Sequence, residues 1–291
     1  MWWNVGEAVR IRDVIDALER AYPTGLAEDW DAVGLVCGDP GSVVQRVLFC
    51  VDPLEATVDE AIDFGAQLVV SHHPLLLRGV HGVPADDHKG RVVHRLIRSG
   101  IGLYCAHTNA DKAKPGVSDA LAGALGLSRT RPLMPAAPGA DTGLGRVGEL
   151  ARAEPFREFV RRVADGLPTT AWGVRGAGDP DREIRTVAVC GGAGDSFLTA
   201  AAEAGVDAYV TADLRHHPAG EHLAQADVPG TSVPALVDVA HWASEWPWCQ
   251  QAADLVSAAL PDTVEVLVST RRTDPWTVHA GATPDPGRAH A

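Results

Sequence analysis

Cysteine is scarce in this sequence, and no two cysteines lie close together. The chain has an odd number of them and no C-x-x-C pair; they are Cys37, Cys50, Cys105, Cys190 and Cys249. This spacing supports neither a disulfide framework nor a zinc ribbon. We therefore expect a protein of the reducing cytoplasm.

Long apolar runs, a secretory leader and an excess of positive charge are missing as well. No uninterrupted apolar stretch approaches the roughly 18 residues of a membrane span, and the amino terminus has no basic segment followed by an apolar core and a cleavage site. The 25 basic residues are outnumbered by 38 acidic ones, which gives a net charge of −13. A negative net charge makes unassisted binding to nucleic acid or an anionic membrane unfavourable. A small anionic ligand would therefore require a local positive group such as a metal ion.

What the sequence does contain is a regular alternation of strands and helices in a chain that is 46% hydrophobic. The predicted order is a helix at 11–21, a strand at 46–52, a helix from Thr57 as N-cap to Gly65, a strand at 67–74, a helix at 91–98, a strand at 101–107 and a helix at 117–125. Such alternation indicates an α/β fold with a largely parallel sheet covered on both faces.

A second, similar region follows a break in composition. Residues 131–143, "RPLMPAAPGADTG", are rich in Pro, Ala and Gly and predict a linker, followed by a strand at 145–150 and a helix at 155–167. The strand and helix pattern resumes at Arg185. The predicted division is a first α/β half at 1–127, a linker and small connecting unit at 128–184, a second α/β half at 185–270 and a loose tail at 271–291.

Comparison of the chain with itself reveals an internal repeat. Residues 47–74 align with 187–218, and residues 99–111 align with 229–245. In this alignment His107-x-x-x-Asp111 corresponds to His241-x-x-x-Glu245, and the pair His72-His73 corresponds to His216-His217. We infer two similar halves, related by a pseudo-twofold axis and facing each other across a cleft. Both histidine motifs are predicted at carboxyl ends of strands, where ligands bind in open α/β sheets.

Imidazole and carboxylate side chains gather at these predicted strand ends. The six donors are His72, His73, His107, Asp111, His241 and Glu245. Their mixture suits zinc, iron or manganese and does not suit calcium. Residues spaced i and i+4 project the same way in a helical turn, whereas adjacent residues of an extended segment point apart. The pattern therefore predicts two divalent metal ions with open coordination positions, in the cleft between the halves.

Two glycine-rich motifs invite other interpretations. "GLGRVG", residues 143–148, fits G-x-G-x-x-G but follows a linker and precedes a strand, so we do not interpret it as a dinucleotide site. "CGGAGDSF", residues 190–197, lies between a strand and a helix, where backbone N–H groups can hold an anion. It lacks the Gly-Lys-Ser/Thr of a P-loop, and a plain tight turn is the preferred interpretation.

The chain resembles the NIF-three-like family of dinuclear-metal proteins, whose members are often labelled homologues of type 2 GTP cyclohydrolase I. The matching motifs run in family order over residues 5–265; they are "EDWDAVGL" (28–35), "SHHPLL" (71–76), "AHTNAD" (106–111), "GLGRVGEL" (143–150), "CGGAG" (190–194) and "DVAHWASE" (238–245). Ala32 stands where the family usually has asparagine, and the insert of longer members has no room here; the small unit at 128–184 takes its place.

The resemblance implies a homohexameric ring that encloses a cavity, with two divalent metal ions in each protomer. By residue, it assigns the metal ligands to His72, His73, Asp111, His241 and Glu245. It leaves His107 as a sixth candidate, either as a ligand or as a catalytic acid or base.

Symmetry and resemblance differ over the second histidine pair. Symmetry alone makes His216 and His217 ligands, whereas the family places both ions at the first pair. We follow the family and expect His216 and His217 to line a cavity, where they bind substrate or shuttle protons.

Three functions remain open on the sequence alone. The preferred one is a metal-dependent hydrolase of a small phosphorylated or nucleotide-like substrate. The alternative is a metal-binding scaffold or metal-handling protein without turnover. The third is a GTP cyclohydrolase-type activity, which no motif for purine recognition supports.

Overall fold

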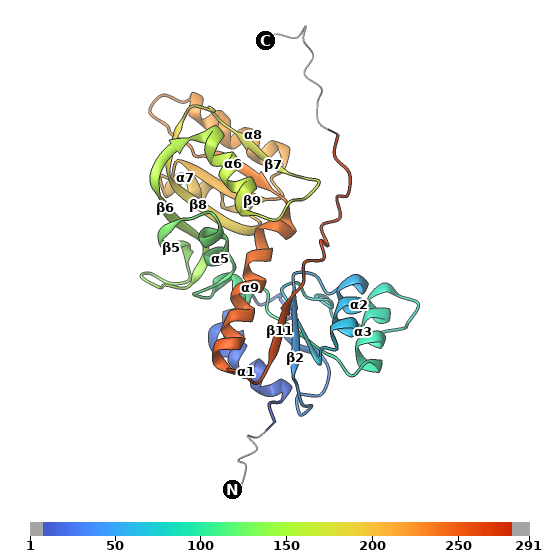
Figure 1. Cartoon of the computed structure of the whole chain (residues 1–291). Helices are drawn as coiled ribbons and strands as arrows, with labels where there is room; N and C mark the ends of the chain where they lie inside the picture. The colour runs from blue at the N-terminus through green and yellow to red at the C-terminus, as the bar shows by residue number, and fades with distance from the viewer. Residues whose placement is uncertain (1–7, 281–291) are drawn as a thin grey trace.

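The computed structural model describes residues 8–280, which form two β-sheets in two lobes joined by a long helix (Figure 1). One hydrophobic cluster runs through both lobes: Val14 on the first helix, Val70 in the first sheet, Trp248 on the long helix and Val237 in the second sheet all belong to it. None of the helices within these residues combines the length and the apolar character that crossing a membrane requires.

The first lobe is built on a five-stranded sheet in the order β1-β4-β3-β2-β11. Its strands are β1 (Gly34–Cys37), β2 (Arg46–Cys50), β3 (Leu68–Ser71), β4 (Gly102–Cys105) and β11 (Glu265–Val268). All neighbours are parallel except β1, which runs antiparallel to β4. Because β3 and β4 are buried along their whole length, they are apolar except for Ser71 at the end of β3, with no alternation of polar residues.

Helices connect and flank these strands. They are α1 (Ile11–Ala21), η1 (Thr24–Leu26), α2 (Glu55–Phe64), α3 (His88–Arg98), α4 (Thr108–Lys112) and α5 (Val117–Ala124). Helix α1 confirms the predicted helix at 11–21, and Gly65 ends α2 in the left-handed conformation that favours glycine. The predicted N-cap was wrong: Leu54 caps α2, and the hydroxyl of Thr57 accepts a hydrogen bond from the Leu54 N–H at 2.9 Å.

The second lobe contains a six-stranded sheet in the order β5-β6-β8-β9-β10-β7. Its elements are β5 (Ser128–Pro135), β6 (Gly143–Pro155), α6 (Phe156–Gly166), β7 (Val174–Ala177), β8 (Glu183–Ala193), η2 (Asp195–Phe197), α7 (Leu198–Glu203), β9 (Ala208–Ala212), α8 (His216–Ala224), η3 (Gln225–Asp227) and β10 (Ala235–Val239). Strands β8, β9 and β10 are parallel, and β5, β6 and β7 pair antiparallel to their neighbours.

One expectation about this region needs revision, and another is confirmed. Residues 128–135, taken as the start of a connecting unit and in part as linker, form strand β5, and β5, β6 and β7 supply half of the second sheet. Strand β6 contains the whole of "GLGRVG" and pairs antiparallel on both sides, so this motif is no dinucleotide loop. Arg146 within it is buried and donates to Asp119 and to three backbone carbonyl groups, which fixes β6 against α5.

The chain returns to the first lobe through α9 (His241–Ala259) and β11, which pairs parallel with β2 (Figure 1). Helix α9 packs on α1 and α5 and lies against strands of both sheets. Because α9 begins at the end of β10 and ends beside the first sheet, it holds its first turn in the space between the two lobes.

The internal duplication is visible in the sheets. Strands β4-β3-β2 match β10-β9-β8 in order and direction, and each triplet has an antiparallel neighbour on the same side, β1 or β7. The register differs from the sequence alignment, however. Leu68 on β3 and Ala208 on β9 hold equivalent ladder positions, and the fifth residue after each is His73 and Asp213. The structural counterpart of His73 is therefore Asp213 and not a histidine of the second pair.

The segment after β11 makes specific hydrogen bonds, which a loose tail would not. Trp246 on α9 donates from its indole N–H to the Ser269 carbonyl at 2.8 Å, and Thr273 donates to Asp52. Asp274 is buried although no regular secondary structure surrounds it. The first part of the predicted tail thus packs across the region between the lobes, and its last residues, 281–291, lie outside those described.

Candidate metal centre

The parallel strands of both sheets end at the same place between the lobes, and the predicted donors gather there. His72 and His73 follow β3 directly, and His107 precedes α4 after β4. His241 opens α9 after β10, and Glu245 lies one helical turn further. The i and i+4 spacing brings His241 Nε2 and Glu245 Oε1 within 3.0 Å of each other.

Glu245 lies at the middle of this group of side chains. Its Oε1 is 3.4 Å from His72 Nε2, and its Oε2 is 3.0 Å from His73 Nε2. The two oxygen atoms of one carboxylate therefore face histidines from different lobes, since His241 comes from the second lobe and His72 and His73 from the first. A carboxylate in this position is placed to bridge two cations.

Two overlapping sets of side chains have the compactness of a metal site. His72, His73 and His107 form one set, and His73, His241 and Glu245 form the other; the potential ligand atoms within each set lie within 4.8 Å of one another. Asp111 lies beside the first set, with its Oδ1 3.7 Å from His72 Nε2. All five residues assigned by resemblance, and His107, are thus brought together.

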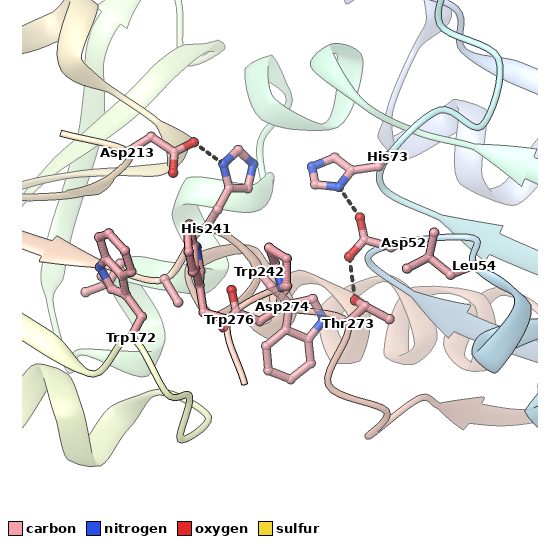
Figure 2. Close-up of a pocket in the computed structure, with 13 residues that line it drawn as sticks. Asp52, Leu54, His73, Trp172, Asp213, His241, Trp242, Thr273, Asp274 and Trp276 are labelled. Atoms are coloured by element: carbon pink, nitrogen blue, oxygen red, sulfur yellow. Dashed lines mark hydrogen bonds and ion pairs between the residues drawn. The ribbon is translucent and has the colours of Figure 1, made fainter. Parts of the chain in front are cut away.

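Three aspartates orient the histidine rings, and the sequence analysis missed all three. His73 Nδ1 donates to Asp52 at 2.7 Å, and His241 Nδ1 donates to Asp213 at 2.7 Å (Figure 2). Because a carboxylate only accepts, each Nδ1 carries a proton, and each Nε2 faces the cleft, where it can bind a cation once any proton of its own has left. Such carboxylate–histidine pairs are the usual support of metal-ligating imidazoles.

The remaining two rings are oriented in the same way. His107 Nδ1 donates to Asp31 at 2.8 Å, and His72 Nδ1 donates to the Ala106 carbonyl at 2.9 Å. Asp31 is itself fixed by the N–H of Ala32 and by the N–H and hydroxyl of Thr108. A signal for these partners was present in the sequence, since Asp52 and Asp213 each follow a buried strand, but the strands had to be placed first.

Two buried atoms at the centre have no hydrogen-bond partner among the described residues. They are His72 Nε2 and Glu245 Oε2, and the latter has only His73 Nε2 nearby, at 3.0 Å, which can donate to it when that ring is protonated. Leaving a buried polar group unpaired costs about 1–3 kcal/mol, and more for a charged one. The two atoms belong to residues that lie within 3.4 Å of each other and face the same space, which is where a cation would satisfy both. The residues present therefore fit a metal site.

Without a bound cation, two histidines of the site, His73 and His241, hold protons. The Glu245 carboxylate raises the pKa of His241 to about 11, against the opposing effect of burial. Burial also disfavours the charged form of His73, but Glu245 and Asp52 outweigh it and raise the pKa of His73 to about 10. The pKa of Glu245 is in turn held well below its ordinary value by the surrounding imidazoles, which outweigh its desolvation.

The other side of the site behaves differently. Burial and the neighbouring His72 lower the pKa of His107, so its ring is neutral at physiological pH. Burial raises the pKa of Asp111 to about 6, with Glu245 adding to the shift and His72 opposing it. His107 thus keeps a free lone pair on Nε2, suited either to a cation or to a proton.

A glycine makes room for the central carboxylate. Gly192, near the end of β8, has φ +70°, and a Cβ on it would lie 2.5 Å from Glu245 Oε1 and 3.2 Å from His241 Nε2. The neighbouring backbone groups are already used: the Gly191 N–H donates to Ser118, and the Gly192 N–H donates to Ser244. "CGGAG" therefore serves close packing against the site, and these two amides are not free to hold an anion.

The second histidine pair does not join the cluster. His216 and His217 begin α8 and are exposed, with their ring centroids 5.1 Å apart. Of the other histidines, His94 and His222 donate to backbone carbonyl groups, and His290 lies outside the described residues.

Two cavities open onto the cluster, and His241 lines both. One, of about 420 Å³, is lined by His73 and His241 together with three tryptophans (Figure 2). The other, of about 310 Å³, is lined by His107, Asp111 and Glu245. A ligand in either cavity reaches the donor atoms. A catalytic metal centre needs such access, whereas a structural one does not.

Known proteins match this chain over most of its length. The family model described as Duf34/NIF3 (NGG1p interacting factor 3) matches residues 9–275. A Streptomyces coelicolor protein named GTP cyclohydrolase 1 type 2 homolog is 52% identical over 280 residues, covering 94% of this chain and 96% of that protein. A Mycobacterium tuberculosis protein of the same name is 40% identical over 375 residues, covering 92% and 97%. Since that alignment is longer than this chain, the mycobacterial relative carries residues inserted between matched segments.

Solved structures share the fold. A Bacillus cereus protein related to NIF3 superposes with a TM-score of 0.83 at 24% identity, and a hypothetical protein of Staphylococcus aureus with 0.82 at 26%. Each comparison covers 93% of this chain and 99% of the other. The two-lobed α/β arrangement is therefore that of these proteins as a whole.

Proposed function

The chain belongs to the Duf34/NIF3 family, and on that premise we propose that it binds two divalent metal ions between its lobes and hydrolyses a small phosphorylated or nucleotide-like substrate there. The proposed ligands are His72, His73, Asp111, His241 and Glu245. His107 is a sixth ligand or the acid or base of the reaction. Imidazole mixed with carboxylate suits zinc, iron or manganese.

The observation that carries the proposal is the common orientation of the rings. Four imidazoles have their Nδ1 atoms engaged on the outside, three by carboxylates and one by a carbonyl. Their Nε2 atoms face Glu245 and one another, with His72 Nε2 buried and unpaired. Ring nitrogens that converge on one buried carboxylate require positive charge between them, which protons on His73 and His241 supply in the metal-free protein and cations would supply in the metal-bound one.

Bound divalent ions supply a water of lowered pKa and polarise the bond that it attacks. The residues of the chain hold this arrangement in place. Glu245 presents one oxygen to each side, Asp52 and Asp213 fix the rings of His73 and His241, and the neutral His107 ring can accept a proton on Nε2. The two cavities give substrate a path to the cluster.

Metal analysis of purified variants tests the ligand assignment. Glu245→Gln removes the bridging charge and is expected to lower metal occupancy strongly. His94→Ala serves as the matched control, because His94 on α3 donates to the Val83 carbonyl outside the cluster. Equal losses in the two variants would show that the ligands are misassigned. Loss of both ions in the double variant of His216 and His217 to Ala would instead restore the symmetric assignment.

Catalysis is tested by a substrate screen. The metal-loaded protein is expected to turn over at least one member of a set of phosphoesters, nucleotides (GTP included, given the name of the relatives) and cyclic amides. Absence of turnover with zinc, iron or manganese would favour a metal-binding scaffold. We further propose, from the family resemblance, that the protomers assemble as a homohexamer in the cytoplasm, which sedimentation analysis of the purified protein tests.

A further inference from the structure

The cavity beside His73 and His241 has a wall that the metal site does not require. Three tryptophans line it: Trp172 before β7, Trp242 in the first turn of α9 and Trp276 in the segment after β11 (Figure 2). We call this space the tryptophan cavity. The rings of Trp172 and Trp276 lie 5.7 Å apart with an angle of 38° between their planes. They therefore contact each other and form a continuous aromatic surface.

This aromatic surface is held in place and partly uncovered. Trp172 donates from its indole N–H to Asp238 at 3.1 Å, and the Arg175 guanidinium lies over its ring at 4.2 Å from the centroid. Trp276 is 57% exposed. A large ring fixed at the edge of a cavity and left in water gains apolar burial when a flat ligand covers it.

Three carboxyl groups line the tryptophan cavity, beside the rings of His73 and His241. Asp52 and Asp213 are engaged by His73 and His241, but Asp274 is only 6% exposed and its Oδ2 has no hydrogen-bond partner within residues 8–280. None of the residues that line the cavity is Lys or Arg. A buried carboxyl without a donor calls for a ligand that donates.

We propose that the tryptophan cavity binds a planar nitrogen heterocycle that carries N–H donors, stacked on the tryptophan wall and hydrogen-bonded to Asp274. The remainder of such a ligand extends past His73 and His241 toward the cluster. Such a heterocycle would be the substrate class of the proposed hydrolase, so its role as a substrate depends on the proposed function. Binding of the ring itself depends only on the cavity, so the two can fail separately.

Calorimetric titration of the full-length protein with three probes tests the proposal. Guanosine offers a flat ring with ring and exocyclic N–H donors, caffeine a flat ring without any N–H, and inorganic phosphate a charge without a ring. We expect guanosine to bind, caffeine to bind roughly tenfold more weakly because the donor to Asp274 is lost, and phosphate to show no binding that guanosine displaces.

Single variants test the contributions of the tryptophan wall and of the Asp274 carboxyl group separately. Trp276→Leu is expected to weaken guanosine binding about tenfold by removing the stacking surface. Asp274→Leu is expected to erase the difference between guanosine and caffeine, because leucine has nearly the shape of aspartate but accepts no hydrogen bond. Trp30→Leu is the matched control, since Trp30 is 60% exposed and lines the other cavity; it should leave guanosine affinity unchanged.

The contrary results are equally specific. Guanosine affinity that is unchanged in either Trp276→Leu or Asp274→Leu, or that falls equally in Trp30→Leu, overturns the proposal. Metal content measured on the same samples reports on the proposed function alone. Bound metal without ring binding would refute only the tryptophan cavity, and ring binding without metal would refute only the metal centre.

Discussion

Replacing Asp213 by asparagine tests the role of the orienting carboxylates with little other change to the protein. Asp213 has φ +57°, a left-handed conformation that asparagine adopts as readily as aspartate. The amide oxygen of the Asp213→Asn variant can still accept the hydrogen bond from His241 Nδ1, which Asp213 now accepts at 2.7 Å. The substitution therefore removes one negative charge and leaves the backbone and the ring position in place.

The size of the effect follows from the exposure of the carboxylate. Loss of such a partner typically lowers metal affinity 10–100-fold, or about 1.4–2.7 kcal/mol. The Asp213 side chain is 56% exposed, so solvent screens its charge and we expect the lower end, about tenfold. The Asp52 side chain, which orients the assigned ligand His73, is only 23% exposed, and Asp52→Asn should fall nearer the upper end, about 100-fold.

Competition with a chelating dye measures both affinities. Asp262→Asn is the matched control, because Asp262 also has a positive φ, +58°, and lies at the surface after α9. It should bind metal as the unmodified protein does. An affinity for Asp213→Asn equal to that of Asp262→Asn would refute the view that this carboxylate supports a metal-ligating histidine.

Further predictions concern packing and protons at the cluster. Gly192→Ala should lose more stability than Gly205→Ala in thermal unfolding, by about 1 kcal/mol or more, because both have positive φ but only the new Cβ at 192 meets Glu245; equal losses would contradict the tight fit. Since the pKa values of metal-free His73 and His241, about 10 and about 11, exceed the ordinary 6.5, both rings are protonated at neutral pH and metal must displace these protons. Chelator competition should thus show affinity rising about tenfold per pH unit for each displaced proton between about pH 6.5 and 10, and a pH-independent affinity would exclude imidazole ligation. In the metal-free protein the same ion pairs stabilise the fold fully below about pH 6.5 and are lost as pH rises through about 10, so chemical denaturation should show stability falling over that interval.

The sequence predicted the α/β fold and the gathering of the donors because both depend on local pattern. Buried strands are apolar along their length, and a histidine at the end of such a strand lies at the edge of a sheet. The repeat then supplied the partners of His72 and His73. Position along the strands, by contrast, was misjudged: the His216 pair was matched to His73, whereas the ladder aligns His73 with Asp213. The short connection between β9 and α8 moves the second histidine pair away from the strand end, although its sequence still resembles that of the first pair.

Sequence pattern alone did not identify the orienting aspartates or the tryptophan cavity. Asp31 and Asp52 come from separate loops and meet their histidines only when the strands are side by side. The segment that carries Asp274 and Trp276 has neither strand nor helix periodicity, and single contacts such as that from Thr273 to Asp52 hold it. Such contacts join residues far apart in the sequence, so the segment resembled a loose tail.

Anomalous X-ray scattering from crystals of the metal-loaded protein tests the central claim most directly, because it locates the ions themselves. We predict two peaks between the lobes, each within about 2.0–2.3 Å of a histidine Nε2 atom, with Glu245 between them. A peak at His216 and His217, or the absence of any peak beside Glu245 in zinc-, iron- and manganese-loaded crystals, would contradict the assignment of this cluster as a dinuclear metal centre.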